Sequence, residues 1–83
     1  MPVNESKIVT TIGMCVVALT KYIMEKQKVN YEVAYKKLLS SELYKLLQDK
    51  ETRLFLEPNV FLCSAYDKEI ESGKEALYAF INE

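Results

Sequence analysis

The sequence predicts an all-α protein, a compact orthogonal bundle of about five helices that forms a single domain over residues 1–83. Two glycines and two prolines are too few for a turn-dense all-β fold. The apolar fraction of 49% and the charged fraction of 28% are ordinary values for a folded globular chain. Apolar residues also recur at spacings of three and four along most of the chain, which indicates amphipathic helices.

The first helix is expected to run from a cap at Asn4 or Ser6 to about Lys26. Over residues 8–24, apolar side chains occupy nearly every side of this helix, which is typical of a helix buried all round. We expect either the other helices or a second copy of the chain to cover it. Gly13 would allow another helix to approach closely.

The apolar run IVTTIGMCVVALT in this helix resembles a short membrane span. Its 13 residues would reach only about 20 Å as a helix, whereas the hydrocarbon core of a bilayer is about 30 Å thick. A signal peptide is disfavoured because Glu5 offsets Lys7, and Met14 before Cys15 does not suit a lipoprotein signal. We therefore expect a cytoplasmic protein that does not bind membranes.

Two helices separated by a tight turn are expected next. Asn30 can cap the first of them, and Val29 is placed to pack on it. Its apolar stripe consists of Tyr31, Ala34, Tyr35, Leu38 and Leu39. After Ser40 and Ser41, a short helix over residues 42–48 directs Leu43, Leu46 and Leu47 inward.

The helical period fails in the segment DKETRLFLEPN, residues 49–59. A turn is expected at its start, then a short extended segment near residues 53–57, and Pro58 ends it. An extended Leu54-Phe55-Leu56 triplet cannot bury all its side chains on one side. We therefore expect Phe55 or its backbone edge to meet a partner, with these candidate interaction residues: Arg53, Leu54, Phe55 and Glu57.

Two more helices complete the predicted bundle. The first follows Pro58 and ends near Glu71, with an apolar stripe formed by Leu62, Cys63, Tyr66 and Ile70. Ser72 and Glu75 have the spacing of a capping box, so the last helix is expected to begin there. Its apolar residues are Leu77, Tyr78, Phe80 and Ile81.

The residues needed for common catalytic sites are missing from the sequence. The chain has no histidine, the commonest general base, and two glycines cannot build a phosphate-binding loop. Cys15 and Cys63 lie far apart and are expected to be reduced, while Asp67 and Glu71 are expected to be solvated surface. We predict no enzymatic activity, no catalytic residue, no cofactor and no metal site.

DNA binding is the alternative function, because residues 29–48 form two helices and a turn in the basic part of the chain. The second of these helices would offer Glu42, Lys45 and Gln48 to base edges, and Lys36 and Lys37 could contact phosphates. However, the chain has a pI near 5.5, below the basic value typical of DNA-binding domains. Nucleic acid is therefore a less favoured partner than protein.

Tyrosine content and charge distribution favour protein interaction. Six tyrosines are present, and Tyr31 and Tyr35, one helical turn apart, are candidate interaction residues. Residues 21–53 carry eight basic and five acidic side chains, whereas residues 54–83 carry two basic and six acidic ones. Opposite charges on two parts of one chain can attract another copy of the chain or a charged partner, although two solvated faces that differ in charge are the ordinary interpretation. We expect a non-enzymatic interaction module that forms a homodimer and can bind a partner protein.

The segment LLSSELYKLLQDKETRLFLEPNVFLCSAYDKEIESGK, residues 38–74, resembles a group of small bacterial proteins, mostly from gut Firmicutes, that are grouped as domains of unknown function. The resemblance rests on short motifs: Ser41-x-Leu43-Tyr44, Leu47-x-Asp49, Thr52-x-Leu54, Glu57-Pro58, Tyr66 and Gly73-Lys74. It implies a small helical cytoplasmic protein. Some of these proteins are encoded near toxin–antitoxin-like genes, which implies a regulatory or neutralising role toward a partner protein.

Overall fold

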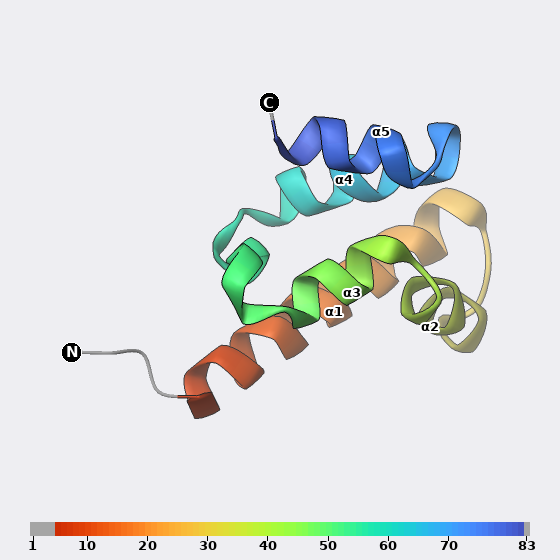
Figure 1. Ribbon diagram of the computed structural model, residues 1–83. Coiled ribbons are helices and arrows are strands. Elements are labelled where there is room, and N and C mark those ends of the chain that lie inside the picture. Colours follow the sequence, from red (N-terminus) through yellow and green to blue (C-terminus); the bar gives the residue numbers. More distant parts are fainter. Residues whose placement is uncertain (1–4, 83) are drawn as a thin grey trace.

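Residues 5–82 are described by a computed structural model, and this part of the chain forms five α-helices and two short 3-10 turns without any strand. The all-α fold predicted from the sequence is therefore confirmed. In chain order the elements are α1 Glu5–Gln27, α2 Tyr31–Leu39, α3 Glu42–Gln48, η1 Lys50–Thr52, η2 Leu54–Leu56, α4 Asn59–Ser72 and α5 Lys74–Ile81 (Figure 1).

Most helix ends follow from local sequence. α1 begins at Glu5, so Ser6 lies inside the helix, and Asn4 is outside the described residues. The Asn30 side chain accepts a hydrogen bond from the Val33 amide at 2.9 Å. The Ser41 hydroxyl accepts one from the Tyr44 amide at 3.1 Å. These two caps fix the starts of α2 and α3, as the sequence predicted.

α1 is the central element of the bundle. α2 packs against it at a steep angle, and α4 also contacts it, while α5 lies beside α4 (Figure 1). The turns η1 and η2 connect α3 to α4, and η2 contacts α1. Because α2 is seen nearly end-on where α1 and α3 run across the view, the bundle is orthogonal rather than parallel (Figure 1).

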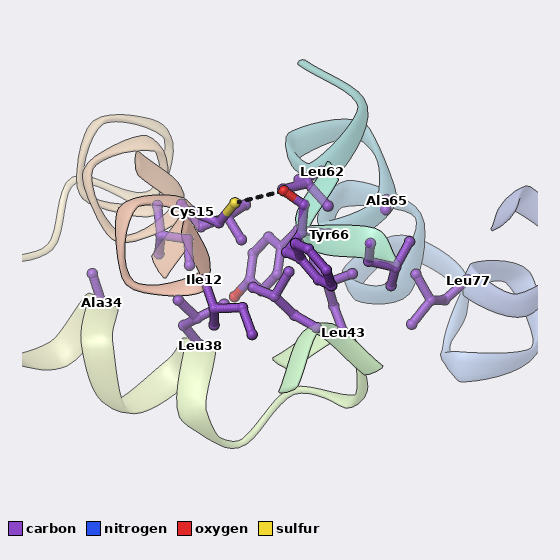
Figure 2. Packing of buried hydrophobic residues seen from close by; sticks show 14 residues of the cluster. Ile12, Cys15, Ala34, Leu38, Leu43, Leu62, Ala65, Tyr66 and Leu77 are labelled. Atoms are coloured by element: carbon purple, nitrogen blue, oxygen red, sulfur yellow. Dashed lines mark hydrogen bonds between the residues drawn. The ribbon is translucent and has the colours of Figure 1, made fainter. Parts of the chain in front are cut away.

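One hydrophobic core joins all five helices and η2. Figure 2 shows the Tyr66 ring, which comes from α4, among core side chains from the neighbouring elements. The core contains Ile12, Cys15, Leu19, Ile23, Ala34, Leu38, Leu43, Leu47, Leu54, Phe55, Leu62, Ala65, Tyr66 and Leu77. Thr20 is also fully buried, and its hydroxyl is satisfied by donating to the Val16 carbonyl at 2.7 Å.

α1 is not buried all round within the single chain. Its buried stripe is Ile12, Cys15, Leu19 and Ile23, at spacings of three and four. On other sides of the helix, the exposed fractions of Val9, Met14 and Val17 are 60%, 68% and 43%. The other helices therefore cover one side of α1 and leave apolar side chains on the rest in water.

The prediction of an extended segment near residues 53–57 is wrong, because Leu54–Leu56 forms a 3-10 turn. Arg53 takes a left-handed conformation (φ 56°, ψ 22°) and redirects the chain between η1 and η2. With three residues per turn, successive side chains point about 120° apart. Leu54 and Phe55 can therefore both enter the core while Leu56 stays 64% exposed.

The prediction that Ser72 caps the start of the last helix is also wrong. Ser72 is the last residue of α4, and Gly73 follows with φ 85°. The Gly73 amide donates to the Glu69 carbonyl at 2.8 Å. A glycine with positive φ is favoured directly after a helix. It therefore ends α4 one residue later than the capping box required, and α5 begins at Lys74 without a side-chain cap.

Candidate interaction surface

The predicted interaction residues of η2 divide into buried and exposed ones. Leu54 and Phe55 are only 3% and 8% exposed, so in the single chain both side chains lie in the core and not at the surface where a partner was expected to meet Phe55. The backbone carbonyl of Phe55 also faces inward, where the Cys15 thiol donates to it at 3.8 Å (Figure 2). Arg53 and Glu57 are exposed. The apolar residue that η2 does present to solvent is Leu56.

Tyr31 and Tyr35 form a stacked pair on α2, with ring centroids 6.0 Å apart and ring planes 14° apart. Tyr31 is 47% exposed, whereas Tyr35 is half-buried. Tyr35 lines a hollow of about 280 Å³ together with Val9, Gly13 and Tyr44. This stacked pair therefore lies beside the N-terminal half of α1, and it offers aromatic surface to a partner.

A second hollow, of about 260 Å³, lies on the same half of α1. It is lined by Ile8, Lys50, Arg53, Phe55 and Leu56, and Lys50 also lines the first hollow. The structure thus brings two sequence-predicted groups, the tyrosine pair and Arg53, to neighbouring places along α1. Neither group was predicted to lie next to α1.

Next to the first hollow lies an apolar surface that we call the α1 outer face, defined by Val9 and Gly13, which also line that hollow, and by Met14 and Val17. A Cβ atom at Gly13 would have no heavy atom within 4 Å, so the space above this residue is open. Sequence reasoning missed these residues as a surface because it treated every apolar residue of the helix as buried. The spacing of Ile12, Cys15, Leu19 and Ile23 is the signal that separates the buried stripe from the outer face.

The polar contacts of α4 serve the fold. The Asp67 carboxylate accepts hydrogen bonds from the Tyr22 hydroxyl at 2.5 Å and from the Lys26 ammonium at 3.0 Å. Hydrogen bonding to Asp67 raises the pKa of both Tyr22 and Lys26. These contacts attach the C-terminal part of α1 to α4.

The N-terminus of α3 is occupied in a way that bears on DNA binding. The Glu69 carboxylate accepts from the amides of Glu42 and Leu43, at 2.7 and 2.9 Å. The Glu42 carboxylate in turn accepts from the Tyr78 hydroxyl at 2.5 Å. A recognition helix contacts bases with its N-terminal residues. In this fold those residues are engaged by one carboxylate of α4 and one tyrosine of α5, which disfavours the helix-turn-helix interpretation.

The two thiols are poor candidates for chemistry. Cys15 is buried and Cys63 half-buried, and both are free. Burial raises the pKa of both thiols, so little reactive thiolate is present near neutral pH. Among the described residues, no group of three or more cysteine or carboxylate side chains is arranged to hold a metal ion.

The observed length of α1 changes the earlier comparison of its 13-residue apolar run with a membrane span. The segment Lys7–Gln27, 21 residues long, is long and apolar enough to cross a bilayer, which the 13-residue run alone is not. A core helix of a soluble protein or a signal sequence would meet the same criterion. In this fold the helix that contains the segment contacts α2, α3 and α4, and its C-terminal part is hydrogen-bonded to α4.

Comparison of the chain with models of protein families, with curated proteins and with solved structures found no match.

Proposed function

We propose that the protein is a non-enzymatic interaction module that self-associates through the α1 outer face. The observation that supports this is the exposure of Val9, Met14 and Val17 on one helix of an 83-residue chain. Large apolar side chains gathered on one surface, next to exposed aromatic residues, are typical of protein interfaces. A location in the cytoplasm is part of the proposal, supported by the free, partly buried thiols.

A second copy of the chain is the occupant that the geometry of this face favours. Gly13 lies midway between Val9 and Val17, four residues from each. In an antiparallel pair of α1 helices centred on Gly13, Val9 would therefore meet Val17 of the partner subunit, and the reverse contact would form by symmetry. Such a self-complementary patch is what a two-fold homodimer requires. The open space above Gly13 would let the two backbones approach closely.

Sedimentation equilibrium or light scattering tests the proposal directly. We expect the wild type to be a dimer at about 100 µM, and Met14→Glu and Val17→Glu to be monomers, because a charge in an apolar interface is costly. Ile70→Glu is the matched control, since Ile70 is 57% exposed on α4, outside the α1 outer face. A wild type that remains a 9.6 kDa monomer at that concentration would contradict the proposal.

Gly13→Leu separates the interface from the fold. Leucine is a better helix former than glycine by roughly 0.8 kcal/mol, and the added Cβ enters open space. We therefore expect a monomer whose thermal stability at low concentration equals or exceeds that of the wild type. If Gly13→Leu dimerises as well as the wild type, α1 helices do not pack closely at this residue.

A further inference from the structure

A cleft of about 690 Å³ lies on the molecule between α1, α2 and α4, and it belongs to neither hollow beside the α1 outer face. Its walls come from the end of α1, the end of α2 and the C-terminal half of α4. Sites for small molecules in helical proteins are commonly built in such clefts between helices, and this volume is in their usual range.

Tyr66 lines this cleft and carries a polar group without a partner. The residue is only 2% exposed, and its hydroxyl makes no hydrogen bond to any described residue. Figure 2 shows the hydroxyl directed toward Leu38, near the end of α2 that forms one wall of the cleft. Buried hydroxyls are nearly always hydrogen-bonded, because leaving one unpaired costs free energy. The Tyr66 hydroxyl is therefore a buried, unpaired donor of a residue that lines the cleft.

The side-chain amide of Gln27 is not a hydrogen-bond partner of the Tyr66 hydroxyl. Gln27 lies on the cleft wall and acts to lower the pKa of Tyr66, against the larger effect of burial, which raises it. The two side chains nevertheless lie outside hydrogen-bond geometry. Because the net shift is upward, the hydroxyl keeps its proton at neutral pH and can donate it.

The charged side chains of the cleft differ between its two walls. On α4, the Asp67 carboxylate is engaged by Tyr22 and Lys26, and the Glu69 carboxylate by the amides of α3. Glu71 is the remaining carboxylate of this wall, and it is exposed to solvent, which screens its charge.

The α2 wall keeps unused hydrogen-bond donors. Neither the Lys37 ammonium nor the Ser40 hydroxyl is held by a hydrogen bond or an ion pair to a described residue. The Lys36 ammonium pairs with Glu32 at 3.2 Å, but both side chains are more than 70% exposed, so this pair is weak. With Tyr66 and Gln27, the free groups near α2 are mainly donors, which suits an anionic oxygen.

The apolar lining of the cleft limits the kind of anion. Ile70 is 57% exposed and forms part of the α4 wall. An inorganic ion would leave this side chain in water, whereas an organic molecule could cover it. We propose that the cleft binds a small organic anion, a carboxylate or a phosphate monoester, whose oxygens accept from Lys37, Ser40 and Tyr66 and whose apolar body lies against Ile70.

Titration of ¹⁵N-labelled protein, followed by NMR chemical shifts, tests this site with three probes: hexanoate, phenyl phosphate and inorganic phosphate. We expect one of the two organic anions to shift the amides of Ser40, Tyr66 and Ile70 with saturation in the millimolar range or below. Inorganic phosphate should bind at least about tenfold more weakly, because it cannot cover Ile70. The probe that saturates first distinguishes a carboxylate site from a phosphate site.

Two variants with matched controls test the assigned groups. Tyr66→Phe and Lys37→Gln should each weaken binding about tenfold, as expected for loss of a hydrogen bond to a charged group. Tyr44→Phe and Lys45→Gln, which change the same residue types outside the cleft, should bind like the wild type. The site is overturned if neither organic probe shifts these amides at 20 mM, or if Tyr66→Phe binds as well as the wild type.

Thermal unfolding in the absence of any anion tests independently whether the Tyr66 hydroxyl lacks a hydrogen-bond partner. If the hydroxyl is unpaired, Tyr66→Phe removes a buried polar group and should raise Tm by roughly 4 °C. A lower Tm for Tyr66→Phe would mean that the hydroxyl is hydrogen-bonded in the free protein, and it would overturn the assignment of an unpaired donor.

Discussion

The two halves of α1 have similar apolar content but different surroundings. In the C-terminal half, Leu19, Thr20 and Ile23 are at most 1% exposed, and Tyr22 and Lys26 bond to α4. In the N-terminal half, Val9 and Met14 are 60% and 68% exposed. Both halves contribute to the core, since Ile12 and Cys15 are also buried, but the two most exposed apolar side chains of α1 lie in the N-terminal half.

η2 packs against the N-terminal half of α1, where Phe55 accepts the Cys15 hydrogen bond, and Phe55 is the largest buried side chain of η2. We expect Phe55→Ala to lower the free energy of unfolding by about 4 kcal/mol, because it removes a buried ring and leaves a cavity. Leu56→Ala, at the next position but 64% exposed, should change it by less than about 0.5 kcal/mol. Urea unfolding of both variants gives the comparison, and similar losses would mean that η2 does not pack as described.

Ile23 tests the well-covered half in the same way. Ile23 is fully buried, so Ile23→Ala should cost about 3 kcal/mol, whereas Val9→Ala on the exposed half should cost less than about 0.5 kcal/mol. Urea unfolding at low protein concentration, where self-association contributes little, measures the difference. A large loss for Val9→Ala under those conditions would indicate that this half of α1 is covered within the single chain.

The polar attachment of the C-terminal half should weaken at alkaline pH. The pKa of Tyr22 and of Lys26 is raised in the folded state by hydrogen bonding to Asp67. A raised folded-state pKa gives stability that is complete below the unfolded pKa, about 10 for both groups, and is lost as the pH rises through the folded value.

Thermal unfolding between pH 8 and pH 11.5 measures this effect. We expect the wild type to lose roughly 2 °C more in Tm than Tyr22→Phe over this range, since the contact is largely exposed. Tyr31→Phe, which changes an exposed tyrosine on α2, is the control and should follow the wild type. If the Tyr22→Phe curve is parallel to that of the wild type, the hydrogen bond to Asp67 does not couple α1 to α4.

Local sequence patterns predict the helices and their caps better than they predict which side chains lie at the surface. The caps at Asn30 and Ser41 depend on residues within one turn of each other, and they were predicted correctly. The predicted stripe of α2 is only partly buried: Ala34 and Leu38 lie in the core, whereas Tyr31 and Leu39 are exposed. The burial of Phe55 and the exposure of Met14 depend on which elements meet across the bundle. Both residues are apolar, so a single sequence does not show that Phe55 is buried and Met14 exposed.

The candidate surfaces illustrate the same limit. Tyr31 and Tyr35 were identified from residue type and spacing, but their position beside α1 depends on how α2 crosses it. The unpaired hydroxyl of Tyr66 gives no sequence signal, because Tyr66 has the spacing of an ordinary core residue. Its proposed role in binding is apparent only in the structure, where Gln27 of α1, Ser40 at the end of α2 and Ile70 of α4 line one cleft.

The contacts that attach α1 to the second half of the chain also bear on how fast the protein folds. The helical pairs α1–α2 and α4–α5 each close through short connections, whereas Cys15 with Phe55 and Tyr22 with Asp67 join residues 40 and 45 positions apart. Closing such loops costs entropy before any packing is gained. Helical bundles with mainly local contacts fold in microseconds to milliseconds. In this chain, docking of α4 and η2 onto α1 should therefore be the slow step, and Phe55→Ala should slow refolding if η2 docks in the transition state.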